Sequence, residues 1–359
     1  MDSNMFPIRS YSRHLAHKIL LTAALTLLSS LSFAMSDPGA IDDVVGDDTI
    51  AELDGIINCT DFDAVQSTAS FPFPAEERFE HFGNSLLALD KPYHMGHDRI
   101  VKAGEAVTVT GKFDYGLAFH KDLEDEKVRA YLTGTGMEGW QDLGTFITNS
   151  DGKIFVPVDG QKEGQYKLRM VVLGDLTYAD AYISAIEPGK KAVVFDIDET
   201  LTTSDLQQVF DYIGLTTADA RPAAAQLVNE YIDRGYQPLF ITARTYWQAK
   251  DTREWLRDAV ELPEFVMRTT LSNGQSLHQA AQYKTQVLQE FQAAGLEIVR
   301  AYGNADTDAQ AFNNVGIPLE NTYMIGKNAG INGTQAIYAE GYLQHISDVV
   351  LNTPHSGCN

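Results

Sequence analysis

The sequence predicts an α/β fold with a Rossmann-like parallel sheet, preceded by an antiparallel β-sandwich domain. Between about residues 100 and 186, short runs of alternating apolar and polar residues are separated by turn residues, which is typical of a sandwich. After the Pro188-Gly189 break, apolar runs alternate with helical patterns. Strands that alternate with helices indicate a parallel sheet with helices on both faces.

The elements are expected in chain order. Residues 1–34 are expected to be a signal peptide, and residues 35–90 an acidic leader with one short helix around residues 50–57. The sandwich is expected over residues 91–188, with strands at 106–110, 128–132, 153–158 and 166–172. The second domain is expected over residues 189–359, with strands at 192–195, 238–241, 297–302 and 322–325 and helices at 218–234, 247–256 and 276–293. The run 192–195 is wholly apolar, as expected of a strand buried on both faces.

Length and charge exclude several classes of protein. The chain has 359 residues, enough for two domains at roughly 150 residues each. Its 27 basic and 49 acidic residues give a net charge of −22, which opposes non-specific attraction to nucleic acid and to anionic membranes. We therefore expect no nucleic-acid partner, and a phosphate or membrane partner would need a local basic site or a bridging metal.

The N-terminus has the pattern of a secretory signal. Arg9, Arg13 and Lys18 precede an apolar stretch over residues 19–31, and residues 32–34 place small side chains at the cleavage-defining positions. The stretch is shorter than the roughly 20 residues that span a bilayer. The sequence therefore predicts cleavage near residue 34, no transmembrane segment afterwards, and a protein exported to the periplasm or secreted.

Two cysteines lie near opposite ends of the expected mature chain, Cys59 and Cys358. In an oxidising compartment, two thiols in an exported chain favour a disulfide between them. The alternative is a pair of unrelated free thiols. Neither the number nor the spacing of the cysteines suits a zinc site.

The strongest chemical pattern is segment 195–202, Phe-Asp-Ile-Asp-Glu-Thr-Leu-Thr. Asp196 and Asp198 leave a buried strand one residue apart, and two carboxylates placed so close together attract a cation, for which Mg²⁺ is the natural choice. Such a pair serves phosphoryl transfer: one carboxylate attacks phosphorus, while the other donates a proton to the leaving oxygen and later activates water. The alternative is a strand end in which both carboxylates only accept backbone hydrogen bonds.

Further polar residues follow the strands where such a site would need them. Thr242 ends the strand 238–241, where its hydroxyl and nearby N–H groups would bind phosphate oxygens. Lys284, on the next helix, would neutralise the phosphoryl group. Gly303 allows a tight turn that presents Asn304 and Asp308 to the metal. Each residue alone is weak support, but their order after successive strands favours a phosphotransfer site.

These residues resemble the four motifs of the haloacid dehalogenase superfamily. Segments 196–205, 241–244, 302–304 and 308–312 look like the catalytic domain of lipins, the Mg²⁺-dependent phosphatidate phosphatases. Segments 111–116, 148–152 and 170–180 are similar to the sandwich and lipin-like C-terminal region of the retinal degeneration B class of phosphatidylinositol transfer proteins. Together the resemblance covers about residues 92–348. The short connections at 202–238 and 245–284 leave no room for a large cap domain.

The resemblance implies a role for each matching residue. Asp196 would be the nucleophile and Asp198 the acid/base, with Thr242, Ala243, Arg244 and Lys284 around the phosphate. Asp196, the backbone carbonyl of Asp198, and Asn304 would hold Mg²⁺, with Asp308 in support. Two positions depart from lipins: Glu199 replaces a glycine and Ala305 replaces a usual arginine.

Three functions remain open from the sequence. The first is an exported Mg²⁺-dependent phosphatase for a lipid phosphate such as phosphatidate, and the second is a soluble phosphomonoesterase. The third is a non-catalytic phosphatidate-binding module, which the resemblance suggests because the retinal degeneration B class has a degraded motif, although both aspartates are intact here. A basic rim of Arg244, Lys250, Arg253 and Arg257 would favour a phospholipid at a membrane surface, but these residues also fit solvated helix charges.

Overall fold

The computed structural model describes residues 64–65, 70–116, 120–203, 219–259, 265–271 and 279–357. The chain divides into two units, Met1–Glu52 and Leu53–Asn359, and every described residue belongs to the second. The predicted signal peptide, the helix around residues 50–57, Cys59 and Cys358 all lie outside the described residues. Within the described part of the chain, no helix is long and apolar enough to span a membrane.

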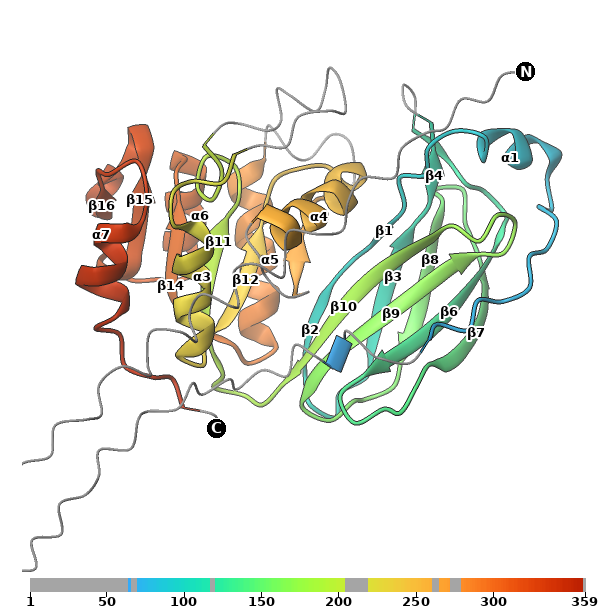
Figure 1. Cartoon of the computed structure of the whole chain (residues 1–359), viewed down its shortest axis with the longest axis horizontal. Helices are drawn as coiled ribbons and strands as arrows, with labels where there is room; N and C mark the ends of the chain where they lie inside the picture. Colours follow the sequence, from blue (N-terminus) through green and yellow to red (C-terminus); the bar gives the residue numbers. More distant parts are fainter. Residues whose placement is uncertain are drawn as a thin grey trace, which may run out of the picture. The chain divides into compact units, whose positions relative to one another are not determined.

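The first domain is a sandwich of two main sheets (Figure 1). One sheet has the order β2 (Arg99–Lys102), β10 (Tyr178–Ile186), β9 (Gly164–Val172), β6 (Lys127–Gly134) and β7 (Gln141–Ile147). The other has the order β1 (Met95–Gly96), β3 (Val107–Lys112) and β8 (Lys153–Val158), and a small hairpin joins β4 (Asp114–Tyr115) to β5 (Lys121–Asp122). A short helix, α1 (Phe82–Leu87), precedes the strands. Apolar side chains of both sheets, such as Val109, Val156 and Leu168, form one buried core.

One pairing departs from the antiparallel prediction. β2 runs parallel to β10, with Arg99 opposite Ile183, whereas β9 pairs antiparallel with both β10 and β6. β2 follows β1 of the other sheet, so no hairpin fixes its direction. Neither β2 nor β10 was among the four strands expected from the alternating pattern, which therefore carried no information on this edge.

The second domain has one parallel sheet of six strands. The order is β13 (Met267–Arg268), β12 (Gln237–Ile241), β11 (Lys191–Asp196), β14 (Glu297–Gly303), β15 (Thr322–Ile325) and β16 (Gln335–Ile337). The four inner strands lie where the apolar runs predicted them. The edge strands β13 and β16 were not predicted, because two or three residues carry no periodic pattern.

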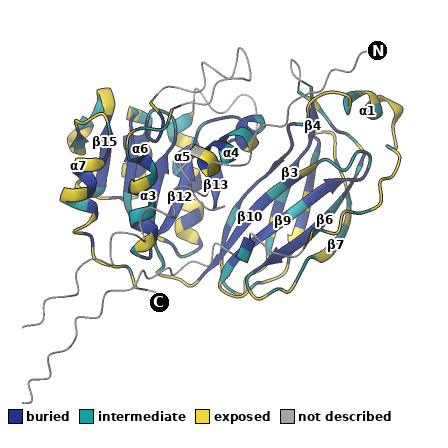
Figure 2. Cartoon of the chain, viewed as in Figure 1, coloured by how far each residue is buried: buried dark blue, intermediate teal, exposed yellow. Residues whose placement is uncertain are grey.

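Helices cover both faces of this sheet (Figure 1), and Figure 2 shows that the strands between them are buried. Val193 and Phe195 of β11 pack with residues of α3 (Ala224–Asp233), α4 (Ala249–Ala259) and the π-helix Ile346–Val350, which directly follows α7 (Leu343–His345). Ala192 and Val194 pack on the opposite side with residues of α5 (Ala280–Ala293) and α6 (Asp306–Asn314). Short 3₁₀ turns occupy Tyr246–Gln248, Leu319–Asn321, Gly326–Asn328 and Ile331–Gly333.

The helix predicted over residues 218–234 begins only at Ala224. Before it, Ala220 bridges to Thr202, and Arg221 donates hydrogen bonds to the backbone oxygens of Glu199 and Thr200 at 2.6 and 3.1 Å. These contacts hold the segment beside the loop after β11. The predicted helix therefore began about one and a half turns too early.

Buried polar contacts tie the sandwich to the second domain. Asp98 follows β1, is fully buried, and accepts hydrogen bonds from Arg253 Nη2 of α4 at 2.6 Å and from the Met267 N–H of β13 at 2.8 Å. The Tyr246 hydroxyl donates to Asp114 Oδ2 of β4 at 2.7 Å. The sandwich therefore contacts both α4 and the loop that follows β12.

Candidate active site

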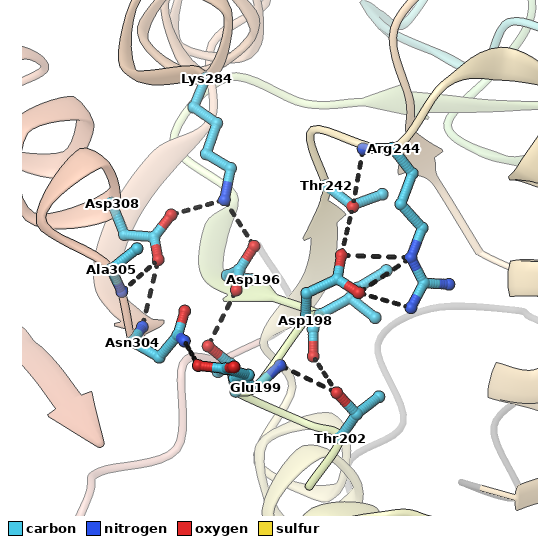
Figure 3. Close-up of polar contacts among 12 residues, drawn as sticks. Asp196, Asp198, Glu199, Thr202, Thr242, Arg244, Lys284, Asn304, Ala305 and Asp308 are labelled. Atoms are coloured by element: carbon cyan, nitrogen blue, oxygen red, sulfur yellow. Dashed lines mark hydrogen bonds and ion pairs between the residues drawn. The ribbon is translucent and has the colours of Figure 1, made fainter. Parts of the chain in front are cut away.

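The predicted polar residues converge at the carboxyl ends of three neighbouring strands. β11 lies between β12 and β14. After β11, the chain adds β12 and β13 on one side of it and then β14, β15 and β16 on the other side. Ligands of open α/β sheets bind at such a switch point. We call the side chains gathered there the active-site rim: Asp196, Asp198, Glu199, Thr242, Arg244, Lys284, Asn304 and Asp308 (Figure 3).

Lys284 joins two carboxylates at the centre of the rim. Its Nζ atom lies 2.5 Å from Asp196 Oδ1 and 2.5 Å from Asp308 Oδ1, and all three side chains are buried. Asp196 ends β11, Lys284 lies in the second turn of α5, and Asp308 lies in the first turn of α6. The Thr200 hydroxyl completes the set by donating to Asp196 Oδ2 at 2.9 Å.

Burial gives this cluster unusual electrostatics. Burial and the nearby Asp308 carboxylate raise the pKa of Asp196 from 3.8 to about 7, although Lys284 acts in the opposite direction. Burial alone would lower the pKa of Lys284, but its contacts with Asp196 and Asp308 outweigh burial and raise that pKa. Lys284 therefore stays protonated, while Asp196 is held in a site that favours additional positive charge.

Asp198 points away from Asp196, toward the loop after β12 (Figure 3). Its carboxylate accepts a hydrogen bond from Thr242 Oγ1 at 2.9 Å and contacts from Arg244 Nε and Nη2 at 2.6 to 3.1 Å. Arg244 also donates to Thr252 Oγ1 at 2.6 Å, and its side chain is fully buried. Arg244, which the resemblance placed at the phosphate, is thus bound to the predicted acid/base.

Asn304 and Asp308 are arranged by the turn after β14. Asp308 Oδ2 accepts hydrogen bonds from the backbone N–H groups of Asn304 and Ala305 at 3.1 and 3.0 Å. A Cβ atom on Gly303 would lie 2.6 Å from the Asp308 Cβ, so only glycine permits this close approach. The predicted tight turn is present. Both carboxylate oxygens of Asp308 accept from protein donors, Oδ1 from Lys284 and Oδ2 from the two backbone N–H groups of the turn.

Glu199 enters the rim from a strained backbone position. Its φ angle is 53°, the left-handed region in which a side chain is disfavoured and glycine is not. Its carboxylate accepts a hydrogen bond from Asn304 Nδ2 at 2.9 Å, and its N–H donates to Thr202 Oγ1 at 2.8 Å. The contact fixes the amide group of Asn304, since the nitrogen is turned toward Glu199.

The donor set of the rim fits Mg²⁺. Magnesium keeps several waters and is usually bound through one or two carboxylates, and Asp196, the Asp198 carbonyl and Asn304 Oδ1 are all oxygen donors. Within the described residues, no three histidine, cysteine, aspartate or glutamate side chains are grouped to hold a metal by themselves. The eight residues of the rim nevertheless include four carboxylates, Asp196, Asp198, Glu199 and Asp308, and two cationic side chains, Lys284 and Arg244, while Arg221 contacts the backbone oxygens of Glu199 and Thr200.

The structure thus brings together nearly every residue that the sequence proposed. Ala243 lies half-buried between Thr242 and Arg244. Three contributors were missed: Thr200, which donates to Asp196; Glu199, which holds Asn304; and Tyr342, whose hydroxyl donates to the Thr200 carbonyl at 2.9 Å. The first two stand inside the Asp-Ile-Asp-Glu-Thr pattern, and Glu199 had also stood out as a departure from the glycine of lipins.

The fold and the site define a β-sandwich followed by an α/β domain with a parallel sheet, and two family models match this division. Residues 92–185 match the beta-sandwich domain of PITM 1-3, and residues 193–326 match the LNS2 domain of PITM 1-3, which is haloacid dehalogenase-like. The upstream likeness to the retinal degeneration B class is confirmed. The finer likeness to lipins stays a prediction.

Individual relatives agree with these matches. Membrane-associated phosphatidylinositol transfer protein 1 of Homo sapiens is 29% identical over 266 residues, which is 71% of this chain and 20% of the relative. The type 3 protein of Homo sapiens is 29% identical over 264 residues, 71% of this chain and 26% of the relative. Protein retinal degeneration B of Drosophila melanogaster is 27% identical over 262 residues, 71% of this chain and 20% of the relative. The chain therefore spans about a fifth to a quarter of the length of these relatives.

The comparisons correct the predicted localisation. Export to the periplasm or secretion is wrong, because relatives such as the type 1 and type 3 proteins are named as membrane-associated phosphatidylinositol transfer proteins. The prediction depended on residues 1–34, which lie outside both matched regions. Basic residues followed by a short apolar run do not by themselves fix a destination.

Proposed function

We propose that the α/β domain is a Mg²⁺-dependent phosphatase that hydrolyses the phosphate monoester of a phospholipid such as phosphatidate. The observation that carries this proposal is the buried contact of Lys284 with both Asp196 and Asp308 at the switch point of the sheet. A nucleophilic carboxylate, a fixed cation for the transferred group and a second carboxylate, here Asp198, are the parts that phosphoryl transfer through an aspartate needs. The phospholipid class is supported by the names of the relatives.

The proposed reaction has two steps. Asp196 attacks phosphorus, the bond from phosphorus to the ester oxygen breaks, and Asp198 gives its proton to the leaving alcohol. Water then attacks the phosphorus of the aspartyl-phosphate, and Asp198 takes a proton from that water. The bond between phosphorus and Asp196 breaks, which releases inorganic phosphate and restores the free carboxylate of Asp196. Lys284 neutralises the phosphoryl oxygens in both steps, and Thr242 turns from Asp198 to donate to them.

Asp196, the Asp198 carbonyl and Asn304 would hold Mg²⁺ beside the nucleophile. Bound there, the ion would supply positive charge that favours ionised Asp196 and balances the excess of carboxylates. Glu199 would keep the Asn304 amide oriented with its oxygen available as a ligand. The proton transfers themselves belong to Asp198, which has to leave its ion pair with Arg244 to reach the leaving group.

That ion pair also supports a second candidate, a phosphate-binding module without turnover. Arg244 holds Asp198 at 2.6 Å, so in this arrangement the predicted acid/base is turned away from Asp196 and is engaged in an ion pair. The type 1 and type 3 relatives are, in addition, named as transfer proteins and not as hydrolases. A soluble phosphomonoesterase is the third candidate, with the same chemistry and a different substrate.

One set of assays separates these candidates. We expect hydrolysis of phosphatidate in mixed micelles that requires Mg²⁺, stops with EDTA and exceeds hydrolysis of glycerol 3-phosphate. Asp196→Asn is expected to lower the rate by at least about a thousandfold, since the nucleophile is lost. Asp306→Asn is the matched control, because Asp306 is exposed on α6 and contacts Gln310 and Asn332.

Other outcomes assign the other functions. Turnover of soluble esters alone would indicate the phosphomonoesterase. Retained binding of phosphatidate vesicles without turnover under any divalent metal would indicate the binding module. Unchanged turnover in Asp196→Asn would exclude Asp196 as nucleophile.

A further inference from the structure

A second polar pocket lies between the sandwich and α4. Its volume is about 300 Å³, and its walls come from β9, β10, the segment around β1, and α4. None of its lining residues belongs to the active-site rim. The pocket is therefore separate from the proposed phosphatase site, and a ligand could bind in it whether or not the rim is catalytic.

The pocket is locally basic in an acidic protein. Four cationic side chains line it, Arg169, Lys250, Arg253 and Arg257, against two acidic ones, Asp180 and Glu254. The whole chain has a net charge of −22, so an excess of cations at one place is unexpected from composition. A site of this sign attracts anions.

Two of the guanidinium groups are fixed in position. Arg169 donates from Nε and Nη2 to the two oxygens of Asp180 at 2.8 and 2.7 Å, and it lies over the Tyr178 ring at 4.0 Å from the centroid. Arg253 donates to Asp98 and lies over the Tyr182 ring at 4.4 Å. Stacked and paired arginines lose little further freedom when a ligand binds, so their donors are preorganised.

Donors remain for a ligand. Arg169 Nη1 has no hydrogen-bond partner among the described residues, since Asp180 takes only Nε and Nη2. Lys250 is exposed and forms no ion pair within the part of the chain that the structure describes. Its charge still acts across the pocket, where it helps to lower the pKa of buried His94. An anion between Arg169 and Lys250 would meet the Nη1 group of a fixed guanidinium on one side and an exposed ammonium on the other.

The structure assigns this pocket a ligand class: we propose that it binds the phosphate of a phosphomonoester, as a lipid headgroup or as a soluble ester. The lining itself has two more cations than acids, and Arg253 and Arg257 also pair with Asp98 and Asp258 outside the lining, so Arg169 Nη1 and Lys250 are the donors that the pocket offers to a phosphate. A volume of about 300 Å³ suits a headgroup-sized ligand and lies at the lower end of small-molecule sites. Half-exposed Tyr178 adds an apolar ring beside the basic side chains.

The structure also changes the membership of the basic cluster that the sequence suggested, Arg244, Lys250, Arg253 and Arg257. Arg244 is not part of it, because that side chain is buried against Asp198. The fold adds Arg169 from β9, far away in sequence, to Lys250, Arg253 and Arg257 of α4. A sandwich strand and a helix of the second domain therefore share one anion site.

The test compares a variant of the pocket with a matched surface variant. Lys250→Gln combined with Arg257→Gln removes two exposed cations from α4, and Lys102→Gln removes an exposed cation at the end of β2, outside the pocket. The probes are glycerol 3-phosphate, followed by calorimetry in EDTA, and phosphatidylcholine vesicles with and without phosphatidate, followed by flotation. The full chain is used throughout, with a thermal unfolding curve for each variant.

We expect the double variant to bind at least about tenfold more weakly than Lys102→Gln, with the remaining affinity falling as salt rises. Weaker binding of both glycerol 3-phosphate and phosphatidate vesicles supports a phosphate site that accepts soluble esters and lipid headgroups. Weaker binding of one probe alone supports a phosphate site for that class of ligand. Arg169→Lys keeps a charge beside Asp180 and removes the Nη1 donor, so it is also expected to weaken binding. Equal binding by all variants in both arms would overturn the proposal.

Discussion

The active-site rim and the pocket at α4 both combine carboxylates with cationic side chains, but carboxylates are in excess in the rim and cations are in excess among the residues that line the pocket. In the rim, four carboxylates face two cationic side chains, and the central Lys284 is buried between Asp196 and Asp308. In the pocket, four cationic side chains face two carboxylates, and Lys250 and Arg257 are exposed. The rim therefore suits a cation and the pocket an anion.

Burial makes the two regions respond differently to change. A buried ion pair cannot lose one partner without leaving the other charge in a medium of low polarity. An exposed pair such as Arg257 and Asp258 is screened by water and contributes little to folding. We therefore expect mutations in the rim to affect stability and activity together, and those of exposed pocket residues to affect binding alone.

Lys284→Met gives the largest expected effect on stability. The substitution leaves Asp196 and Asp308 buried without their shared cation, so we expect a loss of about 3–5 kcal/mol in the free energy of unfolding, measured by urea denaturation in EDTA. Mg²⁺ is expected to restore part of this loss by binding Asp196.

Arg257→Gln is the matched measurement from the pocket. Its exposed pair with Asp258 should change the free energy of unfolding by less than about 0.5 kcal/mol. If Lys284→Met and Arg257→Gln had similar effects, the contrast drawn between the two regions would be mistaken.

The sequence predicted the inner strands of the α/β domain well, because β11, β12, β14 and β15 are covered on both faces and therefore consist of apolar runs. It failed at β13 and β16, which are too short for a pattern. It also failed at the parallel pairing of β2 with β10, because direction at an edge depends on contacts distant in sequence.

The site was predicted as a set of residues but not as a set of contacts. Strand ends meet at one edge of a parallel sheet, so the order of strands and helices along the chain was enough to group Asp196, Asn304 and Asp308. The turn of Asp198 toward Arg244 depends on the path of the loop after β12, where Tyr246 is held by Asp114 of the sandwich. No local pattern encodes such a contact between domains.

Acid should weaken the pocket side of the molecule through a buried histidine. Burial, helped by the charge of Lys250, lowers the pKa of His94 to about 3, so the unfolded chain binds a proton below pH 6.5 that the folded chain does not. Stability is therefore complete above pH 6.5 and falls as the pH drops. Between pH 6.5 and about pH 5 we expect a loss of about 2 kcal/mol from this residue.

Urea denaturation across this pH range measures the effect. His94→Gln is expected to flatten the profile, whereas His355→Gln, at an exposed position, should not. Part of the slope will remain in both variants, because burial also lowers the pKa of His345 in the α/β domain to about 4. If the free energy of unfolding of His94→Gln had the same pH dependence as that of the unmodified protein, His94 would not contribute to the loss of stability in acid.

The smallest effect expected from a change in the rim tests how Glu199 adds to its negative charge. Glu199→Ala and Glu199→Gly both remove the carboxylate that accepts from Asn304, so both should weaken Mg²⁺ binding, measured by calorimetry, to a similar extent. They differ in backbone strain, because φ at this position is 53°. Glycine adopts that angle freely and alanine does not, so the Gly variant should be more stable than the Ala variant by about 1 kcal/mol. Equal stability of the Ala and Gly variants would show that the loop relaxes around residue 199. Unchanged Mg²⁺ affinity in both variants would show that the Glu199 carboxylate does not contribute to the negative charge that distinguishes the rim from the pocket.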